Sequence, residues 1–270
     1  MAPRRAPCYP GRVLAIETHG LTRLFDGKAA VSDLSLGVPA GAFYGFLGPN
    51  GAGKSTTMKL LTGLLAPTSG RASVLGHDLA DSGQALAVRR LVGVVPDGLS
   101  LFERLTGVEQ LRIHGQLYGL PRAEAARRAD ELLVAMELTG DAGKVVGDYS
   151  HGMKKKLALA GALIHGPRLL FLDEPFEGID AVAVSGIRRM LQQLVQGGQM
   201  TIFLTSHVLE VVERLVTHVG IIRQGRLAAQ GTLEEVRGAG TLEEVFIRTI
   251  GEDVKDRRLS WLGEPGPEGG

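Results

Sequence analysis

The chain of 270 residues is long enough for one large domain or two small ones, and 44% hydrophobic and 22% charged residues are typical of a globular protein. A formal net charge of +1 gives no general electrostatic reason to expect binding to nucleic acid or to an acidic membrane surface. The single cysteine, Cys8, excludes an internal disulfide and suits a reducing cytosol.

Residues 1–12 at the start of the chain are rich in proline and arginine. They carry charges but no apolar core, so they do not form a secretory signal, and we expect a disordered leader. We expect the globular part to span residues 13–247.

Short apolar, β-favouring runs alternate with helical patterns along the globular part. The runs cover residues 43–47, 92–95, 169–173, 201–205 and 219–222. This alternation is typical of an α/β fold, in which a parallel sheet carries helices on both faces. Ligands of such sheets bind at the carboxyl ends of the strands, so residues that follow these runs are candidates for a site.

A phosphate-binding loop follows the first of these runs and leads into a helical segment. Its residues are Gly48, Pro49, Asn50, Gly51, Ala52, Gly53, Lys54, Ser55 and Thr56, which fit the pattern G-x-x-x-x-G-K-[ST]. Glycines let backbone N–H groups converge on a phosphate chain, and the helix adds the positive end of its dipole. We expect Lys54 to reach the β- and γ-phosphates and Ser55 to ligate Mg²⁺. The alternative is a glycine-rich turn that binds nothing, but the order of strand, loop and helix favours a nucleoside triphosphate.

The middle of the chain, residues 98–152, contains no comparable strand. Helical patterns cover residues 107–118 and 122–136, and Pro121 stands at a plausible start of the second. We therefore expect a helical subdomain inserted into the α/β core.

Ser150 is a natural N-cap for the helix that follows this subdomain. Lys154, Lys155 and Lys156 fall in the first turns of that helix, where they oppose its dipole at a cost of up to about 1 kcal/mol each. Either the lysines are simply solvated, or the Ser-x-Gly turn faces an anion that offsets their charge. The sequence leaves both interpretations open.

The most apolar stretch, residues 157–172, begins in the same helix. His165, Gly166, Pro167 and Arg168 interrupt it. No segment therefore reaches the ~20 apolar residues of a membrane-spanning helix, and we expect the chain not to cross a membrane by itself.

Two carboxylates, Asp173 and Glu174, end the apolar run 169–173. In phosphate-loop proteins the first acidic residue at such a strand end holds Mg²⁺, usually through water, and the next can act as general base for an attacking water. His207 follows the run 201–205 and is expected at the same sheet edge, where a neutral imidazole could bond the γ-phosphate or orient water and Glu174. Taken singly, these residues could instead be a solvated strand end and a structural histidine.

The sequence Thr-Leu-Glu-Glu-Val occurs twice near the end of the chain, at residues 232–236 and 241–245. Each copy offers a threonine N-cap with a glutamate three residues later, which is a capping box at the start of a short helix. The tail, residues 248–270, is rich in glycine, proline and glutamate from Gly263, and we expect disorder from that point.

Together, these residues resemble the ATP-binding subunit of an ATP-binding-cassette (ABC) transporter, over roughly residues 13–247. In that family Asp173, Glu174, a following Asp180 and a switch histidine, here His207, occur in this order after the phosphate loop. The resemblance implies that Phe25 stacks on adenine and that an antiparallel β subdomain accompanies the core. The family signature Leu-Ser-Gly-Gly-Gln is matched only at Ser150 and Gly152, and this variant resembles the exporter branch that serves separate permeases for drugs, lipids or polysaccharides.

Asp97 stands where the family usually has glutamine and related exporter subunits often have glutamate. A carboxylate can hold Mg²⁺ or its water, but it repels phosphate and cannot donate a hydrogen bond when ionised. Ala181, where a proline commonly follows Asp180, is a smaller departure. The carboxylate of Asp97 is therefore expected to affect the rate of ATP turnover and the coupling of that turnover to a partner through its loop.

The resemblance implies an ATPase that binds ATP and Mg²⁺, with Ser55, Asp97 and Asp173 as metal-site residues. Two such subunits, identical or different, would sandwich two ATP molecules between the phosphate loop of one and Ser150 and Gly152 of the other. A separate permease would hold the pair at the cytoplasmic face of the cell membrane and contact residues 97–105, where Leu99, Leu101 and Phe102 are either core or partner surface. No nucleic-acid partner is expected.

Two alternative functions belong to other classes. One is a soluble ABC ATPase that acts on ribosomes or DNA, which the single cassette and low charge disfavour. The other is a regulatory subunit that senses ATP and hardly hydrolyses it, which Asp97 keeps open.

Overall fold

The computed structural model describes residues 11, 13–179, 181–198 and 200–251 of the chain. The predictions of a disordered leader over residues 1–12 and of disorder from Gly263 lie, except for Gly11, outside the described residues. The same is true of the role predicted for Asp180.

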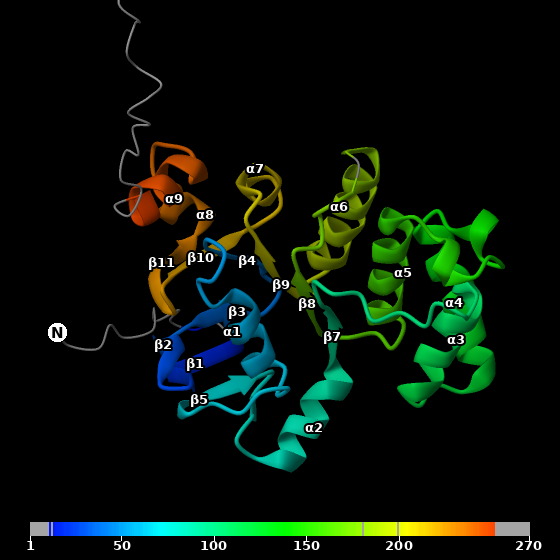
Figure 1. Ribbon diagram of the computed structural model, residues 1–270, viewed down its shortest axis with the longest axis horizontal. Coiled ribbons are helices and arrows are strands. Elements are labelled where there is room, and N and C mark those ends of the chain that lie inside the picture. The colour runs from blue at the N-terminus through cyan, green and yellow to red at the C-terminus, as the bar shows by residue number, and fades with distance from the viewer. Residues whose placement is uncertain (1–10, 12, 180, 199, 252–270) are drawn as a thin grey trace, which may run out of the picture.

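A six-stranded sheet lies at the centre of the described part of the chain (Figure 1), in the order β11-β10-β4-β9-β8-β7. Its strands are β4 (Phe43–Leu47), β7 (Val92–Val95), β8 (Leu169–Asp173), β9 (Thr201–Ser206), β10 (His218–Arg223) and β11 (Arg226–Thr232). All neighbours pair in parallel except β10 and β11, which form an antiparallel hairpin. The predicted parallel sheet is confirmed.

The strand order brings four carboxyl ends together. In β4, β9, β8 and β7, which are consecutive neighbours, the parallel registers place Leu47 opposite Ser206, Asp173 opposite Thr205, and Leu172 opposite Val95. The segments that follow these strands therefore start at one edge of the sheet, which is where such folds bind ligands.

A second, antiparallel sheet packs against the first. It consists of β1 (Leu14–Phe25), β2 (Lys28–Leu34), β3 (Gly37–Pro39), β5 (Ser69–Val74) and β6 (His77–Asp78), in the order β2-β1-β5-β6 with β3 also on β1. Register shifts interrupt the pairing of β1 with β2, β3 and β5, so the long strand β1 can bend and serve three partners.

Helices cover both faces of the central sheet. The helices of the described residues are α1 (Lys54–Leu61), α2 (Ser82–Leu91), α3 (Gly107–Leu117), α4 (Arg122–Ala135), α5 (His151–Leu163), α6 (Ala181–Gln196), α7 (Leu209–Glu213), α8 (Leu233–Arg237) and α9 (Leu242–Ile250), with 3-10 turns η1 (Thr139–Asp141) and η2 (Val146–Asp148). Figure 1 shows α3 and α4 at the end of the molecule opposite α8 and α9. Among the described residues, none of the helices is both long and apolar enough to cross a membrane.

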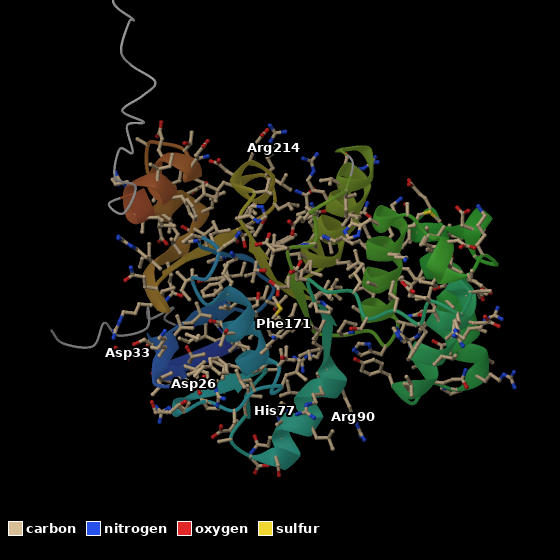
Figure 2. All side chains as sticks on the ribbon, in the orientation of Figure 1. Asp26, Asp33, His77, Arg90, Phe171 and Arg214 are labelled. Carbon is tan, nitrogen blue, oxygen red and sulfur yellow. The ribbon has the colours of Figure 1, made fainter. Side chains whose placement is uncertain are left out.

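Side chains alternate between two hydrophobic clusters, one on each face of the central sheet. Phe43 and Leu47 of β4 point into a cluster with α5, α6 and α7, whereas Tyr44 and Phe46 point into a cluster with α1 and the antiparallel sheet. In the second cluster the ring of Phe203 lies 5.3–5.7 Å from those of Tyr44, Phe46 and Phe171. Figure 2 shows Phe171 in the middle of the molecule, with Arg90 and Arg214 pointing outward.

The local capping signals predicted from the sequence are present. Thr232 and Thr241 each form a capping box, at the starts of α8 and α9, and Ser150 caps α5 by accepting a bond from the Met153 amide. Pro121 stands at the N-cap of α4. The predicted helices at 107–118 and 122–136 correspond to α3 and α4, each one residue shorter.

Candidate functional site: a cleft at the carboxyl edge of the sheet

The loop between β4 and α1 needs glycine at two positions where other backbone approaches closely. A Cβ on Gly48 would lie 2.5 Å from the carbonyl oxygen of Ile222, and a Cβ on Gly53 would lie 2.4 Å from that of Ala30. Gly53, the N-cap of α1, also has a φ of 106°, which side chains disfavour, and no side chain caps the helix there. The first amides of α1 therefore remain available to an anion.

Lys54 begins α1, and its side chain is largely buried against the loop. Its Nζ donates to the Gly48 carbonyl at 2.8 Å and lies 3.5 Å from Oε1 of Glu174. The ammonium group thus lies between the loop and the end of β8, so it contributes positive charge to the space between them.

Glu174 follows β8 with a φ of 47°, a conformation that costs a non-glycine residue roughly 1 kcal/mol or more. Its amide donates to the backbone carbonyl of Thr205 at 3.2 Å. Asp173, the preceding residue, is buried and accepts a hydrogen bond from the Thr205 hydroxyl. The end of β8 is therefore held by β9, with Asp173 directed inward and Glu174 toward the loop.

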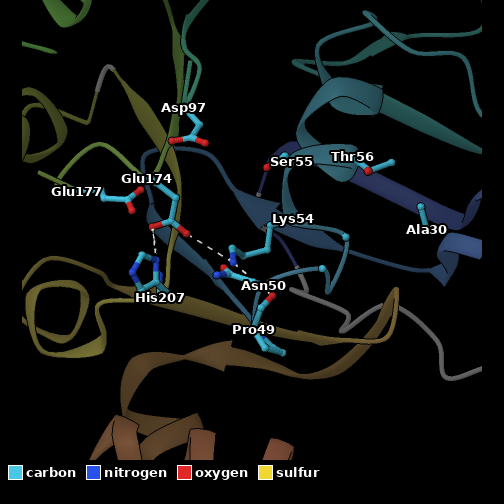
Figure 3. A pocket seen from close by; sticks show the side chains of 12 residues that line it. Ala30, Pro49, Asn50, Lys54, Ser55, Thr56, Asp97, Glu174, Glu177 and His207 are labelled. Atoms are coloured by element: carbon cyan, nitrogen blue, oxygen red, sulfur yellow. Dashed lines mark hydrogen bonds and ion pairs between the residues drawn. The ribbon is translucent and has the colours of Figure 1, made fainter. Parts of the chain in front are cut away.

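His207 follows β9 and binds the carboxylate of Glu174 twice (Figure 3). Its Nδ1 lies 3.0 Å from Oε2 of Glu174, and its backbone amide donates to the same oxygen at 3.2 Å. Because an ionised carboxylate only accepts, Nδ1 carries the proton in this contact, and Nε2 accepts when the imidazole is neutral. His207 thus orients the carboxylate.

These elements enclose a cleft of about 440 Å³. Its lining residues are Ala30, Pro49, Asn50, Gly51, Gly53, Lys54, Ser55, Thr56, Asp97, Glu174, Glu177 and His207. The structure thus brings most of the predicted loop together with Asp97, Glu174 and His207. The sequence analysis did not predict that Glu177 and Ala30 line this cleft. The position of Glu177, three residues after Glu174, was a signal that could have indicated it.

Three carboxylates face the same cleft. Asp97 is exposed beyond the end of β7, while Glu174 and Glu177 belong to the segment after β8. Figure 3 shows Asp97 and Glu174 on one side of the cleft, with Lys54 and Ser55 across from them. The cleft therefore has a cationic side at the loop and an anionic side at the ends of β7 and β8.

Several predicted residues do not line this cleft. Phe25 lies at the tip of the β1–β2 hairpin, 44% exposed, with the Arg23 guanidinium 4.6 Å from its ring centre. Ser150 and Gly152 lie at the start of α5, where Ser150 is exposed. Asp173 is buried and does not line the cleft.

The three lysines of α5 each have an intramolecular partner. Lys154 lies 3.3 Å from a carboxylate oxygen of Glu103, and Lys156 lies 3.0 Å from one of Glu137. Lys155 is buried and donates to two backbone carbonyls in the segment after β8. Lys155 is therefore neither solvated nor facing an anion at the Ser-x-Gly turn.

The loop after Asp97 divides between core and surface. Leu99 and Leu101 are partly buried and line a second cavity of about 260 Å³, whereas Phe102 is 53% exposed. His114 of α3 also lines this cavity, and burial lowers its pKa. Of the three apolar side chains, Phe102 is the one available to a partner.

The residues of the cleft fit Mg²⁺. Ser55 supplies a hydroxyl and Asp97 a carboxylate, and Mg²⁺ prefers oxygen ligands, usually one or two from the protein plus phosphate and water. Among the described residues, no group of three or more His, Cys, Asp or Glu side chains forms a complete metal site. An ion here would therefore be shared with a bound phosphate chain.

The fold and the cleft define a phosphate-loop nucleoside triphosphatase: a parallel sheet, a loop with Lys54 at the start of a helix, and a carboxylate after a neighbouring strand. A family model described as ABC transporter matches residues 31–177. The chain belongs to the ABC transporter family, as an ATP-binding subunit.

Relatives with similar sequences are named as ATP-binding proteins. The chain is 40% identical to the daunorubicin/doxorubicin resistance ATP-binding protein DrrA of Streptomyces peucetius, over 83% of this chain and 67% of that protein. It is 37% identical to the Nod factor export ATP-binding protein I of Rhizobium leguminosarum bv. viciae, over 85% and 74%. A solved structure of an ATP-binding subunit of an ABC transporter superposes with a TM-score of 0.80 at 31% identity, covering 88% of this chain and 99% of that one.

Proposed function

We propose that this chain hydrolyses ATP and uses the energy to drive export by a separate membrane permease. The observation that carries the proposal is the convergence of Lys54, Glu174 and His207 on one cleft, with the carboxylate oriented by two bonds from His207. Lys54 and the amides of α1 would bind the β- and γ-phosphates, and Glu174 would accept the proton of the attacking water. Mg²⁺, held by Ser55 and Asp97, would neutralise phosphate charge.

The export direction and the permease are inferred from relatives. One similar protein is named for drug resistance and another for export, and both are ATP-binding proteins rather than whole transporters. The exposed Phe102, in the loop that follows Asp97, supports contact of this loop with a permease at the cytoplasmic face of the membrane. Phe25 would stack on adenine, and Ser150 and Gly152 would contact the ATP of a second subunit.

The regulatory alternative is an ATP-binding subunit that hardly turns over. It is favoured by Asp97, which adds negative charge to the side of the cleft that faces the phosphates. Steady-state turnover of the full chain with Mg²⁺ and ATP separates the two functions, because only the transporting ATPase requires sustained hydrolysis.

Two variants test the site itself. Glu174→Gln keeps the shape of the side chain but removes the base, so we expect ATP binding within about twofold of wild type and turnover at least ~100-fold lower. Lys54→Ala removes the ammonium from the loop and should weaken ATP binding itself, measured by equilibrium titration. Wild-type turnover in the Glu174→Gln protein would remove the proposed base.

The partner is tested by purifying the tagged chain from detergent-solubilised native membranes. A multi-spanning protein in near-equal amount is the expected result. Recovery of ribosomal or DNA-repair proteins instead would contradict the transport function and favour the soluble ABC ATPase.

A further inference from the structure

Lys155 is a buried cation beside the candidate site but outside the cleft. It lies on the same face of α5 as Leu159 and Ala162, because residues spaced by three or four share one face of a helix. All three side chains are less than 10% exposed, so this face of α5 is buried. A lysine is rarely buried unless its ammonium is hydrogen-bonded or paired, so the contacts of its Nζ explain its position.

The Nζ of Lys155 donates to the carbonyl of Glu174 at 2.8 Å and to that of Glu177 at 2.6 Å. Burial lowers the pKa of Lys155, while the nearby carboxylates of Glu177, Asp97 and Glu174 act in the opposite direction. The ammonium therefore lies close to the anionic side of the cleft and binds the backbone that carries two of its carboxylates.

Together with a hydrogen bond to β9, the bond from Lys155 holds the backbone of Glu174 on both sides of its Cα. Its amide donates to Thr205 of β9, and its carbonyl accepts from Lys155 of α5. Both peptide groups that flank its Cα are thus held, one by each neighbouring element, although its φ of 47° is unfavourable. Fixing both peptide groups fixes the direction in which the side chain leaves the backbone.

The same helix carries the Ser-x-Gly turn. Gly152 lies next to Ile179, and a Cβ on Gly178 would lie 3.0 Å from the ring of His151, so the start of α5 packs directly on the segment after Glu174. A displacement of the start of α5 would therefore move Lys155 and, through its hydrogen bond, the backbone of Glu174.

We propose that Lys155 is a positioning residue, which holds the Glu174 carboxylate in place and couples it to the start of α5 within one chain. The proposal rests on the proposed hydrolysis of ATP with Glu174 as base. Lys155 contacts neither nucleotide nor the attacking water in this role; it acts through the backbone of residues 174–177.

Three full-length variants test this role. Lys155→Met keeps the apolar stem and removes the donors, Lys155→Gln keeps one shorter amide donor, and Lys156→Met is the matched control, since Lys156 pairs with the remote Glu137. We expect Lys155→Met to lower the kcat for ATP at least ~10-fold with KM within twofold, Lys155→Gln to recover part of the loss, and Lys156→Met to match wild type. If Lys155→Met does not fold, the Gln variant is compared with wild type alone.

Amide hydrogen exchange gives a readout that needs no turnover. The Glu177 amide donates to the Glu174 carbonyl, so we expect it to exchange at least ~10-fold faster in Lys155→Met and at the wild-type rate in Lys156→Met. An unchanged kcat, or unchanged exchange at Glu177, would overturn the proposal. A wild-type chain that binds ATP without turnover would contradict the proposed function instead, and the exchange rates would still decide the role of Lys155.

Discussion

Asp97 adds a third carboxylate to a cleft that already contains Glu174 and Glu177. Its negative charge would face the phosphate chain of a bound ATP across several ångströms of solvated cleft. Removing that charge should make the free energy of ATP binding more favourable by about 1 kcal/mol. We therefore expect Asp97→Asn to bind ATP roughly fivefold more tightly without Mg²⁺, while half-maximal turnover requires more Mg²⁺ because a charged metal-site carboxylate becomes a neutral amide. Titration of ATP with and without Mg²⁺ measures both effects.

Asp130→Asn is the control for this change of net charge, since Asp130 lies on the exposed surface of α4 beside Arg112. It should alter neither quantity. If Asp97→Asn weakened Mg²⁺-free ATP binding, the carboxylate would not be repelling the phosphates.

At the residue scale, the sequence predicted which side chains meet but not how they are held. Spacing along the chain indicated the loop at Lys54, and strand ends indicated Glu174 and His207, because parallel strands bring their carboxyl ends to one edge. Lys155 was missed because three successive lysines were interpreted together as surface or anion-binding. Its helical spacing to Leu159 was the available signal, but burial of a lysine depends on carbonyls from a distant segment that no local pattern reveals.

At the scale of elements, β7 approaches α5 so closely that one glycine decides their packing. A Cβ on Gly93 would lie 2.3 Å from the carbonyl oxygen of Ala162 and 3.0 Å from Leu170. Backbone cannot yield as a flexible side chain can, so we expect Gly93→Ala to reduce the free energy of unfolding by about 1–3 kcal/mol. Chemical denaturation monitored by circular dichroism measures the difference.

Gly186 in α6 provides the opposite case for comparison, since apart from its own helix backbone no atom of the described residues lies within 4 Å of the position that a Cβ would take there. Alanine at this position should raise the free energy of unfolding by about 0.5–1 kcal/mol, because glycine lowers helix stability. Equal effects of the two substitutions would show that the approach of β7 to α5 does not limit stability.

The five parallel strands of the central sheet were predicted to within a residue at each end, because both faces of this sheet are buried and these strands read as continuous apolar runs. The antiparallel edge strand β11 of the same sheet was not predicted. The strands of the antiparallel sheet were not found from residue patterns. In β1, polar residues such as Glu17 and His19 stand among apolar ones, and register shifts break the alternation. Only the family resemblance indicated that sheet.

At the scale of the whole molecule, two groups of the predicted nucleotide-contacting residues lie apart. Lys54, Ser55 and Asp97 line one cleft, whereas Ser150 and Gly152 lie at the start of α5 and do not line it. Within one chain they do not form a single site. Contact of both groups with the same ATP therefore requires a second copy or a similar subunit.

This separation predicts that the dimer can be lost without losing the nucleotide. In a Glu174→Gln chain, Gly152→Glu would place a carboxylate against the phosphates of the partner's ATP. Among the described residues of the chain itself, only the Ile179 side chain comes within 4 Å of the Cβ position, at 3.8 Å. We expect unchanged ATP binding by titration but a monomer in sedimentation velocity with ATP, where Glu174→Gln alone gives a dimer. Gly140→Glu is a substitution in η1, where the Cβ position of Gly140 has no atom of the other described residues within 4 Å, and it should leave the dimer intact. A dimer that persists in Gly152→Glu would mean that the start of α5 does not face the second nucleotide.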